Sequence, residues 1–342
     1  MEKRLLSLVL ILVAVFSGCR TLPMEEAGRG MPSYASDFEN TLMQEQFNTL
    51  SERVLRVVSY VGYETQVFEP GSNITLEMLK SDGVELSGVR TRQHSNESFG
   101  GTALVVSTDD SAAVLLTCRH VVSYPDTVFS YDDRADRYGN RYLLGISVKS
   151  DQLVVVSDGR THWPALLCSE DPENDLALIR IQRYFGTSGM VSLLAVDDSG
   201  FPRWGDRVWM LGYPSGKAVL TGGILSRCRD NDRLLVTDAP FSEGCSGAAA
   251  FVWDNYAGVF RLAGIGRSVA ARTRFQLRPE SRIHEKSYNT SLPYRGAVFI
   301  DPVKEHVPGV TFIIPAPVIM NFLDNTDTRC FGPEGLSRNP LR

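Results

Sequence analysis

The sequence predicts an all-β fold of the sandwich or barrel type, with one helix before it and a short helix after it. Short apolar or alternating runs recur from about residue 100 to about residue 314, separated by Gly, Asp, Asn and Pro. This texture is typical of many short strands joined by turns. Apolar residues recur at helical spacing only on either side of this region.

Residues 1–18 predict an export signal. Lys3 and Arg4 precede an apolar run from Leu5 to Phe16, which is shorter than the roughly 20 residues that a permanent membrane helix needs. The segment that ends at Cys19 resembles the lipobox of bacterial lipoproteins, because small residues precede the cysteine at the expected cleavage point. The alternative is an ordinary secretory signal with an incidental cysteine.

The lipobox resemblance implies that Cys19 carries lipid, including palmitate, and that residues 19–36 tether the protein to a membrane. The expected location is therefore the bacterial cell envelope, with the protein lipid-anchored. Position 20 is Arg rather than Asp, which in such lipoproteins implies the outer membrane facing the periplasm where two membranes are present.

A helix is expected from about residue 37 to residue 52, where apolar residues recur at helical spacing. It should end, and a strand should begin, near Arg53. Its apolar face could pack on its own barrel or support a homo-oligomer such as a trimer. Residues 61–98 are polar and irregular, and they are interpreted as a long surface loop.

Strands are expected along the rest of the chain, interrupted by two segments that read as inserted, solvated loops, 124–140 and 273–295. A final helix is expected over residues 316–325, after Pro315, with a tail at 331–342. The expected strands are 102–107, 113–117, 153–157, 177–181, 208–212, 234–236, 248–253, 259–265, 297–300 and 310–314.

The segment from Glu243 to Ala248 contains a candidate nucleophile, Ser246. A nucleophilic serine needs a tight turn that exposes its hydroxyl, and glycines two residues before it and one after it permit that backbone. The N–H groups of Gly244 and Ser246 would then form an oxyanion hole.

A base and an orienting carboxylate stand elsewhere in the chain. His120 follows an apolar strand within Thr117–Val122, and Asp175 opens the apolar run Leu176–Leu178. Serine is unreactive at neutral pH without a base, and a carboxylate holds that base in the productive tautomer. The chain order His, Asp, Ser matches one known triad order.

These segments resemble those of trypsin-like serine proteases of the HtrA/Deg type, namely T-x-x-H-V-V, D-P-x-x-D-L-A-L and G-N-S-G-G. With weaker matches such as G-Y-P at 212–214, the resemblance runs from about Gly100 to Leu323. It implies a double six-stranded β-barrel over residues 37–330. It also implies a serine endopeptidase that hydrolyses envelope or unfolded proteins through an acyl-enzyme, without cofactor. Residues 324–342 are too few for the PDZ domain of that family.

The resemblance also suggests how a protein or peptide substrate binds. Pro240 lies six residues before Ser246, at the base of the expected specificity pocket, and it is uncharged. We therefore expect cleavage after small or medium apolar residues. Gly264, Ile265 and Gly266 would form the strand that pairs with substrate.

Two neighbours compete for catalytic roles. Asp171 precedes Pro172 and is the better candidate for a turn residue. Cys245 has Gly before it and Ser after it, so it does not occupy the nucleophile position. Glu243 and Cys245 depart from the family pattern. The alternative function is therefore an inactive, protease-like lipoprotein that serves as a binding or scaffold module.

Composition argues against other classes. The net charge is −5 and spread along the chain, so nucleic acid is not an expected partner. The cysteines have no zinc-binding spacing, so no metal is expected. If Cys19 is lipidated, five cysteines remain, whose pairing the spacing does not define: Cys118, Cys168, Cys228, Cys245 and Cys330.

Overall fold

The computed structural model describes residues 38–69, 71–81, 89–108, 112–135, 139–182, 184, 203–226, 234–279, 291, 293, 296, 298–327 and 330. The predicted signal, the tether with Cys19 and the tail at 331–342 lie outside these residues. Within the described residues, no helix has the length and apolar character needed to cross a membrane.

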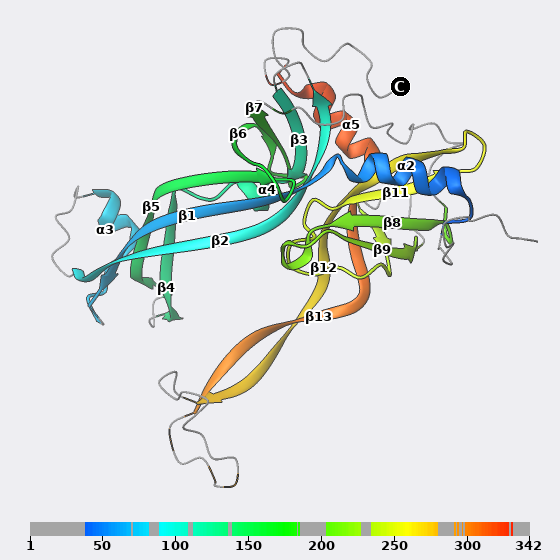
Figure 1. Cartoon of the computed structure of the whole chain (residues 1–342). Helices are drawn as coiled ribbons and strands as arrows, with labels where there is room; N and C mark the ends of the chain where they lie inside the picture. The colour runs from blue at the N-terminus through cyan, green and yellow to red at the C-terminus, as the bar shows by residue number, and fades with distance from the viewer. Residues whose placement is uncertain are drawn as a thin grey trace, which may run out of the picture. The chain divides into compact units, whose positions relative to one another are not determined.

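Six strands of the first sheet close into a barrel. The strand order is β1-β2-β3-β7-β6-β5-β4, and β1 also pairs with β5, which closes the barrel (Figure 1). The seventh strand, β4, pairs with β5 alone and is not part of the closed ring. All of β3 is buried, as expected for an apolar strand at the centre of a closed sheet. The strands are β1 (Val54–Phe68), β2 (Val89–Thr108), β3 (Ala112–Cys118), β4 (Thr127–Ala135), β5 (Arg141–Ser157), β6 (His162–Asp171) and β7 (Leu176–Gln182).

The second sheet has the order β10-β13-β12-β11-β8-β9. Among the residues that the structure describes, its two end strands meet at a bridge between Leu225 and Thr237 and at the 2.8 Å hydrogen bond from Ser226 N to Val236 O. The all-β, two-barrel prediction is confirmed, with the second barrel nearly open. The strands are β8 (Arg207–Gly212), β9 (Val219–Ile224), β10 (Leu235–Thr237), β11 (Ala249–Asp254), β12 (Val259–Pro279) and β13 (Val298–Pro315).

Both predicted terminal helices are present, as α2 (Thr41–Ser51) and α5 (Ala316–Asn325). The handover from helix to strand falls at Arg53, as expected, because β1 begins at the next residue. Phe47 of α2 is buried and its ring lies 5.7 Å from that of Phe260 on β12. The apolar face of α2 therefore packs on its own second sheet, the first of the two roles considered for it.

Three loop predictions are wrong. Residues 61–98 contain the outer halves of β1 and β2, which pair from Val54–Leu104 out to Phe68–Val89, with the short helix α3 (Leu76–Ser81) between them. Residues 127–135 form β4. Residues 273–279 continue β12 and pair with β13. The outer parts of β1, β2, β4 and β5 pack with α3 around a small separate cluster of Phe68, Ile74 and Leu143, whereas the outer part of β12 is exposed. Few apolar residues stand among many polar ones in these segments, so the strands gave little apolar signal.

Candidate active site

The nucleophile loop lies between β10 and β11 and is tied to the first barrel. Thr102 N donates to Ser246 O at 2.8 Å, and Thr102 Oγ1 donates to Gly244 O at 2.8 Å. Gly247 has φ 87°, and a Cβ there would lie 2.0 Å from Thr102 O, so only glycine fits. These contacts hold Ser246 at the junction of the two barrels.

His120 stands in the single-turn helix α4 (Arg119–Val122), which follows β3 directly. Asp175 fixes this turn, since its backbone carbonyl accepts from Arg119 N at 2.9 Å and its Oδ1 accepts from His120 N at 3.0 Å. Asp175 itself has φ 59°, a left-handed conformation that Asp tolerates better than most residues. The backbone at Asp175 therefore positions both its own carboxylate and the histidine.

The three predicted triad side chains lie within hydrogen-bond distance. His120 Nδ1 lies 2.8 Å from Asp175 Oδ2, and His120 Nε2 lies 2.9 Å from Ser246 Oγ. The Asp175 side chain is 13% exposed, whereas that of His120 is 49% exposed. A buried carboxylate thus orients an accessible imidazole next to the hydroxyl, which is the geometry that general-base activation of serine requires.

A fourth side chain, missed in the sequence, contacts this group. Arg267 Nε lies 3.2 Å from Asp175 Oδ2. Burial raises the pKa of Asp175, but hydrogen bonds from His120 and the charges of His120 and Arg267 outweigh it, so the pKa lies below its ordinary value of 3.8. Asp175 is therefore ionised at neutral pH. Arg267 follows a predicted strand and carried no local signal of this role.

Asp171 is a turn residue in the structure. Its Oδ1 accepts from the N–H groups of Glu173 and Asn174 at 3.0 and 3.1 Å, and its Oδ2 accepts from Asn174 Nδ2 at 2.6 Å. These bonds hold the turn that leads to Asp175.

The loop around Ser246 leaves two amide groups available. Within the described residues, the N–H groups of Gly244 and Ser246 have no hydrogen-bond acceptor, whereas Cys245 N donates to Ser242 O at 3.0 Å. Cys245 is buried in the core of the second sheet, and burial raises the pKa of its thiol. Glu243 is exposed. An anion beside Ser246 could therefore accept hydrogen bonds from the N–H groups of both Gly244 and Ser246.

A small apolar pocket lies beside Ser246 and includes Pro240. Its volume is about 10 Å³, room for about one water molecule. The ring of Phe241 and the side chain of Met210 both line it, and both also lie close to Gly266. The residues that line the pocket are Met210, Gly212, Pro214, Val219, Thr221, Pro240, Phe241, Cys245 and Ala248.

Gly264, Ile265 and Gly266 lie inside the second sheet rather than at its edge. Gly264 pairs with Ala250 on one side and Pro315 on the other, and Gly266 N donates to Ala248 O at 2.7 Å. The first β12 carbonyl oxygen that faces Ser246 belongs to Arg267, 3.4 Å from Ser246 Oγ. The register shift between Gly266 and Ser268 turns the strand there. The free edge of β12 therefore begins at Arg267, whereas the residues predicted to pair with substrate, 264–266, are joined to neighbours on both sides.

One further group near the triad resembles a metal site by spacing. Ligand atoms of Cys118, His120 and Asp175 lie within 4.8 Å of one another. Cys118 Sγ donates to Gly266 O at 3.3 Å, and burial raises the pKa of the thiol. Metal ligation needs a thiolate, so this cluster fits a hydrogen-bonded core better than a metal centre.

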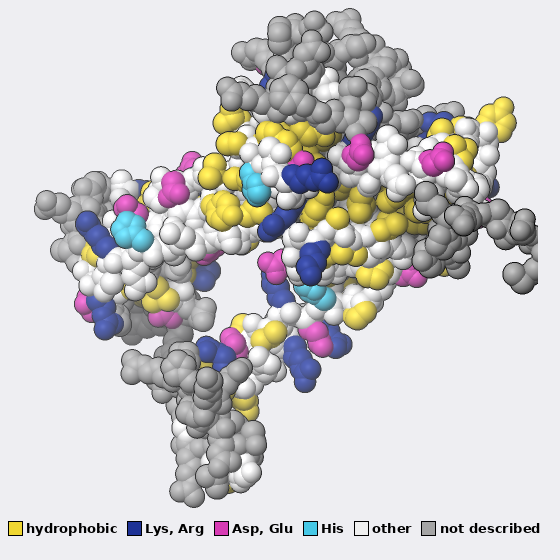
Figure 2. All heavy atoms as spheres, viewed as in Figure 1, with side chains coloured by type: hydrophobic (Ala, Val, Ile, Leu, Met, Phe, Trp, Pro, Cys, Tyr) yellow, Lys and Arg dark blue, Asp and Glu magenta, His cyan; other side chains and the backbone are white. Residues whose placement is uncertain are grey.

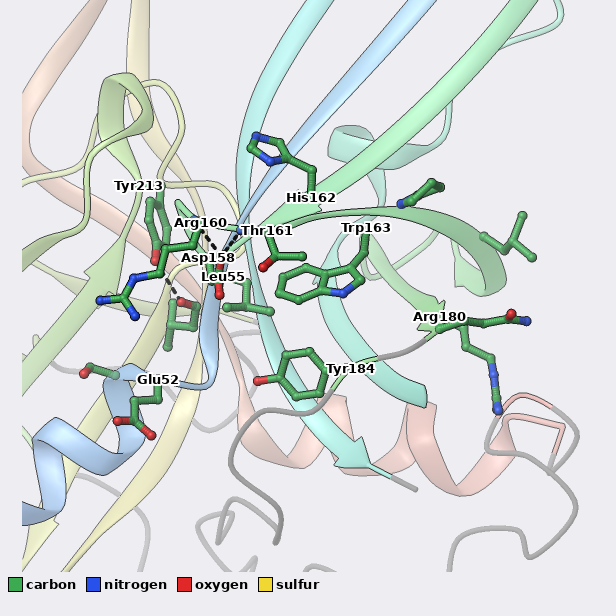
Figure 3. Close-up of a pocket in the computed structure, with 15 residues that line it drawn as sticks. Glu52, Leu55, Asp158, Arg160, Thr161, His162, Trp163, Arg180, Tyr184 and Tyr213 are labelled. Atoms are coloured by element: carbon green, nitrogen blue, oxygen red, sulfur yellow. Dashed lines mark hydrogen bonds between the residues drawn. The ribbon is translucent and has the colours of Figure 1, made fainter. Parts of the chain in front are cut away.

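A large cavity lies away from His120, Asp175 and Ser246. It measures about 1320 Å³ and is lined by the end of α2, the start of β1 and the β5–β6 turn, with Trp163 and Tyr184 facing into it (Figure 3). Trp163 and Tyr184 are in edge contact at 5.5 Å. It contains none of the predicted catalytic residues, so its size is not a guide to the chemistry.

Comparison with known proteins gives one family match. Residues 101–258, which include His120, Asp175 and Ser246, match the family model of the trypsin-like peptidase domain. No curated protein matches the chain. Among solved structures, the chain is similar to the serine endoprotease from Yersinia pestis. The TM-score is 0.44 and the identity 15%, over 88% of this chain and 70% of that chain.

Proposed function

We propose that this chain, whose residues 101–258 match the trypsin-like peptidase domain, is a serine endopeptidase with the triad His120, Asp175 and Ser246. The observation that carries the proposal is the pair of contacts made by His120, 2.8 Å to Asp175 Oδ2 and 2.9 Å to Ser246 Oγ. A binding module with this fold would not need both contacts.

Acylation follows from these positions. His120 Nε2 takes the proton of Ser246 Oγ as the oxygen attacks the substrate carbonyl carbon, and the C–N bond then breaks as His120 returns the proton to the leaving amine. Asp175 keeps the Nδ1 proton in place and stabilises the imidazolium. Water then hydrolyses the acyl-enzyme by the same proton transfers in reverse order.

The N–H groups of Gly244 and Ser246 stabilise the oxyanion in this proposal. Removal of one such donor typically lowers kcat by about 10²–10³-fold. The exposed position of Glu243 keeps its charge in solvent, where screening weakens its repulsion of that oxyanion. The two departures from the family pattern at 243 and 245 therefore leave the chemistry intact.

The small apolar pocket supports cleavage after small apolar residues. A protein or peptide substrate would place its P1 residue, the one before the cleaved bond, beside Pro240 and Phe241. No charged residue lines the pocket among the described residues, so Lys or Arg at this position would lose hydration without gaining a partner.

We further propose that the enzyme works in the bacterial cell envelope, anchored through lipid on Cys19. The support is the sequence of residues 1–19, in which an export signal ends at a lipobox-like cysteine. Metabolic labelling with a palmitate analogue tests the anchor. We expect label on the full chain and none on Cys19→Ala, and equal labelling of both would rule the anchor out.

An active-site fluorophosphonate tests the catalytic proposal. We expect covalent labelling of the full mature chain and cleavage of casein, both abolished in Ser246→Ala. Ser150→Ala changes an exposed serine on β5 and serves as the matched control with full labelling. Absence of labelling in wild-type protein with a cooperative unfolding transition would exclude an active enzyme and favour the binding-module alternative.

A further inference from the structure

The strand that carries Arg267 continues far beyond the active site. β12 runs to Pro279 and pairs with β13 from Ala271–His306 out to Pro279–Val298. Figure 1 shows the two strands leaving their sheet as a two-stranded ribbon, and Figure 2 shows hydrophobic and charged side chains interleaved along it. We call the part formed by 271–279 and 298–306 the arm.

One edge of the arm has no strand partner. β11 pairs with β12 only as far as Ile265, and beyond Gly266 no described strand pairs with β12 on the side away from β13. A row of unpaired N–H and C=O groups is a template for an added strand. From Arg267 to Leu277 this edge is about 33 Å long, at about 3.3 Å per residue.

Two prolines define which residues face the free edge. Pro302 is opposite Phe275 and Pro279 is opposite Val298. Proline has no N–H, so both pairs fit the non-hydrogen-bonded positions of an antiparallel ladder. Such positions alternate, so odd-numbered β12 residues from Ala271 to Leu277 direct their N–H and C=O groups outward. The ladder shifts register between Val269 and Ala271, where residues 307–310 of β13 stand opposite the single residue 270 of β12. The extra residues therefore lie on β13, and β12 keeps its own alternation back to Arg267, whose carbonyl faces Ser246.

The two faces of the arm differ in chemistry. One face is apolar and exposed, with Phe275, Leu277 and Ile300 at 69%, 71% and 71% exposure, and it also includes Pro279, Val298 and Pro302. The other face carries ion pairs of 2.9 Å between Arg272 and Glu305 and 3.0 Å between Arg278 and Asp301. Phe299 and Val303 lie among these charges on the same face. A two-stranded ribbon without a core is only marginally stable in water, and a third strand stabilises it.

We propose that the free edge of the arm binds the substrate segment that precedes the cleaved bond, as a third antiparallel strand. This inference rests on the proposed peptidase function. The edge starts at the carbonyl beside Ser246, and an antiparallel substrate would run its N-terminal part along β12 toward Leu277. This continuity with the active site identifies the occupant as substrate rather than a second copy of the chain.

The register then specifies the substrate class. With P1 opposite Arg267, the ninth and eleventh residues before the cleaved bond lie opposite Phe275 and Leu277 and share their apolar face. The eighth and tenth residues lie on the face of Arg274 and Arg278. The preferred substrate is therefore an extended, unfolded chain with alternating apolar and acidic residues at these positions.

Peptide length provides the first test. Two fluorogenic peptides share the same residues around the cleaved bond, one with about four residues before it and one with about twelve that follow this pattern. We expect kcat/KM to be roughly tenfold higher for the long peptide, which a few cross-strand pairs are enough to supply. Equal values for the two peptides would overturn the inference while leaving the peptidase function established.

Backbone methylation distinguishes strand pairing from unspecific apolar contact. Methylation of the seventh amide before the cleaved bond, which faces the arm, should remove most of the length advantage. Methylation of the eighth amide, which faces away, should leave it unchanged. Equal effects of the two methyl groups would contradict an added strand.

Variants of the arm test whether the higher kcat/KM of the long peptide depends on the arm. Phe275→Ser with Ile300→Ser should lower kcat/KM for the long peptide only, because both side chains are remote from the triad. Leu153→Ser, an exposed leucine on β5, is the control. If the double variant instead dissociates an oligomer in light scattering and leaves the length advantage intact, the arm binds a second copy and the inference is wrong.

A binding measurement tests the role of the arm independently of whether the protein is a peptidase. Fluorescence anisotropy with Ser246→Ala measures affinity for both peptides without turnover. Tighter binding of the long peptide, lost in the arm variants, supports the arm even if the wild-type protein cleaves nothing. Equal affinity rejects it whatever the activity.

Discussion

Phe241 lines the pocket proposed to bind P1, and its replacement provides a quantitative test of that proposal. The pocket of about 10 Å³ accepts little more than a methyl group, so wild-type enzyme should prefer Ala over Leu at P1. Phe241→Ala removes a ring that lines it. Leucine has three more carbons than alanine, and each buried methylene contributes about 0.8 kcal/mol. Full burial would therefore favour Leu by about 2.4 kcal/mol, or about 60-fold.

The assay compares kcat/KM for two peptides that differ only in Ala or Leu at P1. Phe241 packs on the core of the second sheet, so its loss will also lower stability. Titration with a fluorophosphonate corrects for the folded, active fraction. Phe129→Ala removes a partly exposed ring on β4 and should leave the preference unchanged. Wild-type preference for Leu, Lys or Arg, or an unchanged preference in Phe241→Ala, would refute this assignment of the pocket.

Three further predictions concern single side chains. Asp175→Asn should lower kcat on the order of 10⁴-fold with KM little changed, because the amide favours the wrong imidazole tautomer; a loss under tenfold by stopped assay would argue against the triad. Because the folded-state pKa of Asp175 is depressed, its contribution to stability is present above the unfolded pKa and is lost as pH falls. Arg267→Gln removes part of that depression, so urea unfolding between about pH 5 and 2 should show a shallower loss of stability than wild type, and an equal slope would contradict the contact. A hydrogen bond from Cys330 lowers the pKa of the exposed Cys168 thiol, whereas burial raises that of Cys118 and Cys245. Native-state iodoacetamide should therefore modify Cys168 first, and mass spectrometry showing Cys245 first would revive it as a nucleophile.

The three proposed triad residues, which the structure brings within hydrogen-bond distance, could be named from the sequence because each lies in a short local pattern. Ser246 needs glycines within two residues, and Asp175 opens a buried strand, so sequence spacing alone is informative. Arg267 and Phe241 had no such signal. Their roles depend on side chains that reach Asp175 and Gly266 across the fold, which only tertiary structure brings together.

The free edge of β12 differs from the expected one for a related reason. Family spacing put it at residues 264–266, but these residues are needed to join β11 and β13 on both sides. A strand can offer an edge only where one neighbour ends. β11 ends its pairing at Ile265, and the register shift at Gly266 then frees the next residue. Such a shift leaves no mark in composition, so its position could not be read from the sequence.

The arm, by contrast, has a strand-like sequence pattern, but its many polar and charged residues made that pattern easy to overlook. Residues 272–279 alternate basic or polar residues with Thr273, Phe275, Leu277 and Pro279, a period of two that predicts a strand. Its many charges favoured a loop interpretation, because a strand buried on one face normally carries more apolar residues. A two-stranded ribbon without a core needs only a narrow apolar face, and most of its charged side chains lie on the opposite face. The even spacing of the apolar residues therefore mattered more than their number.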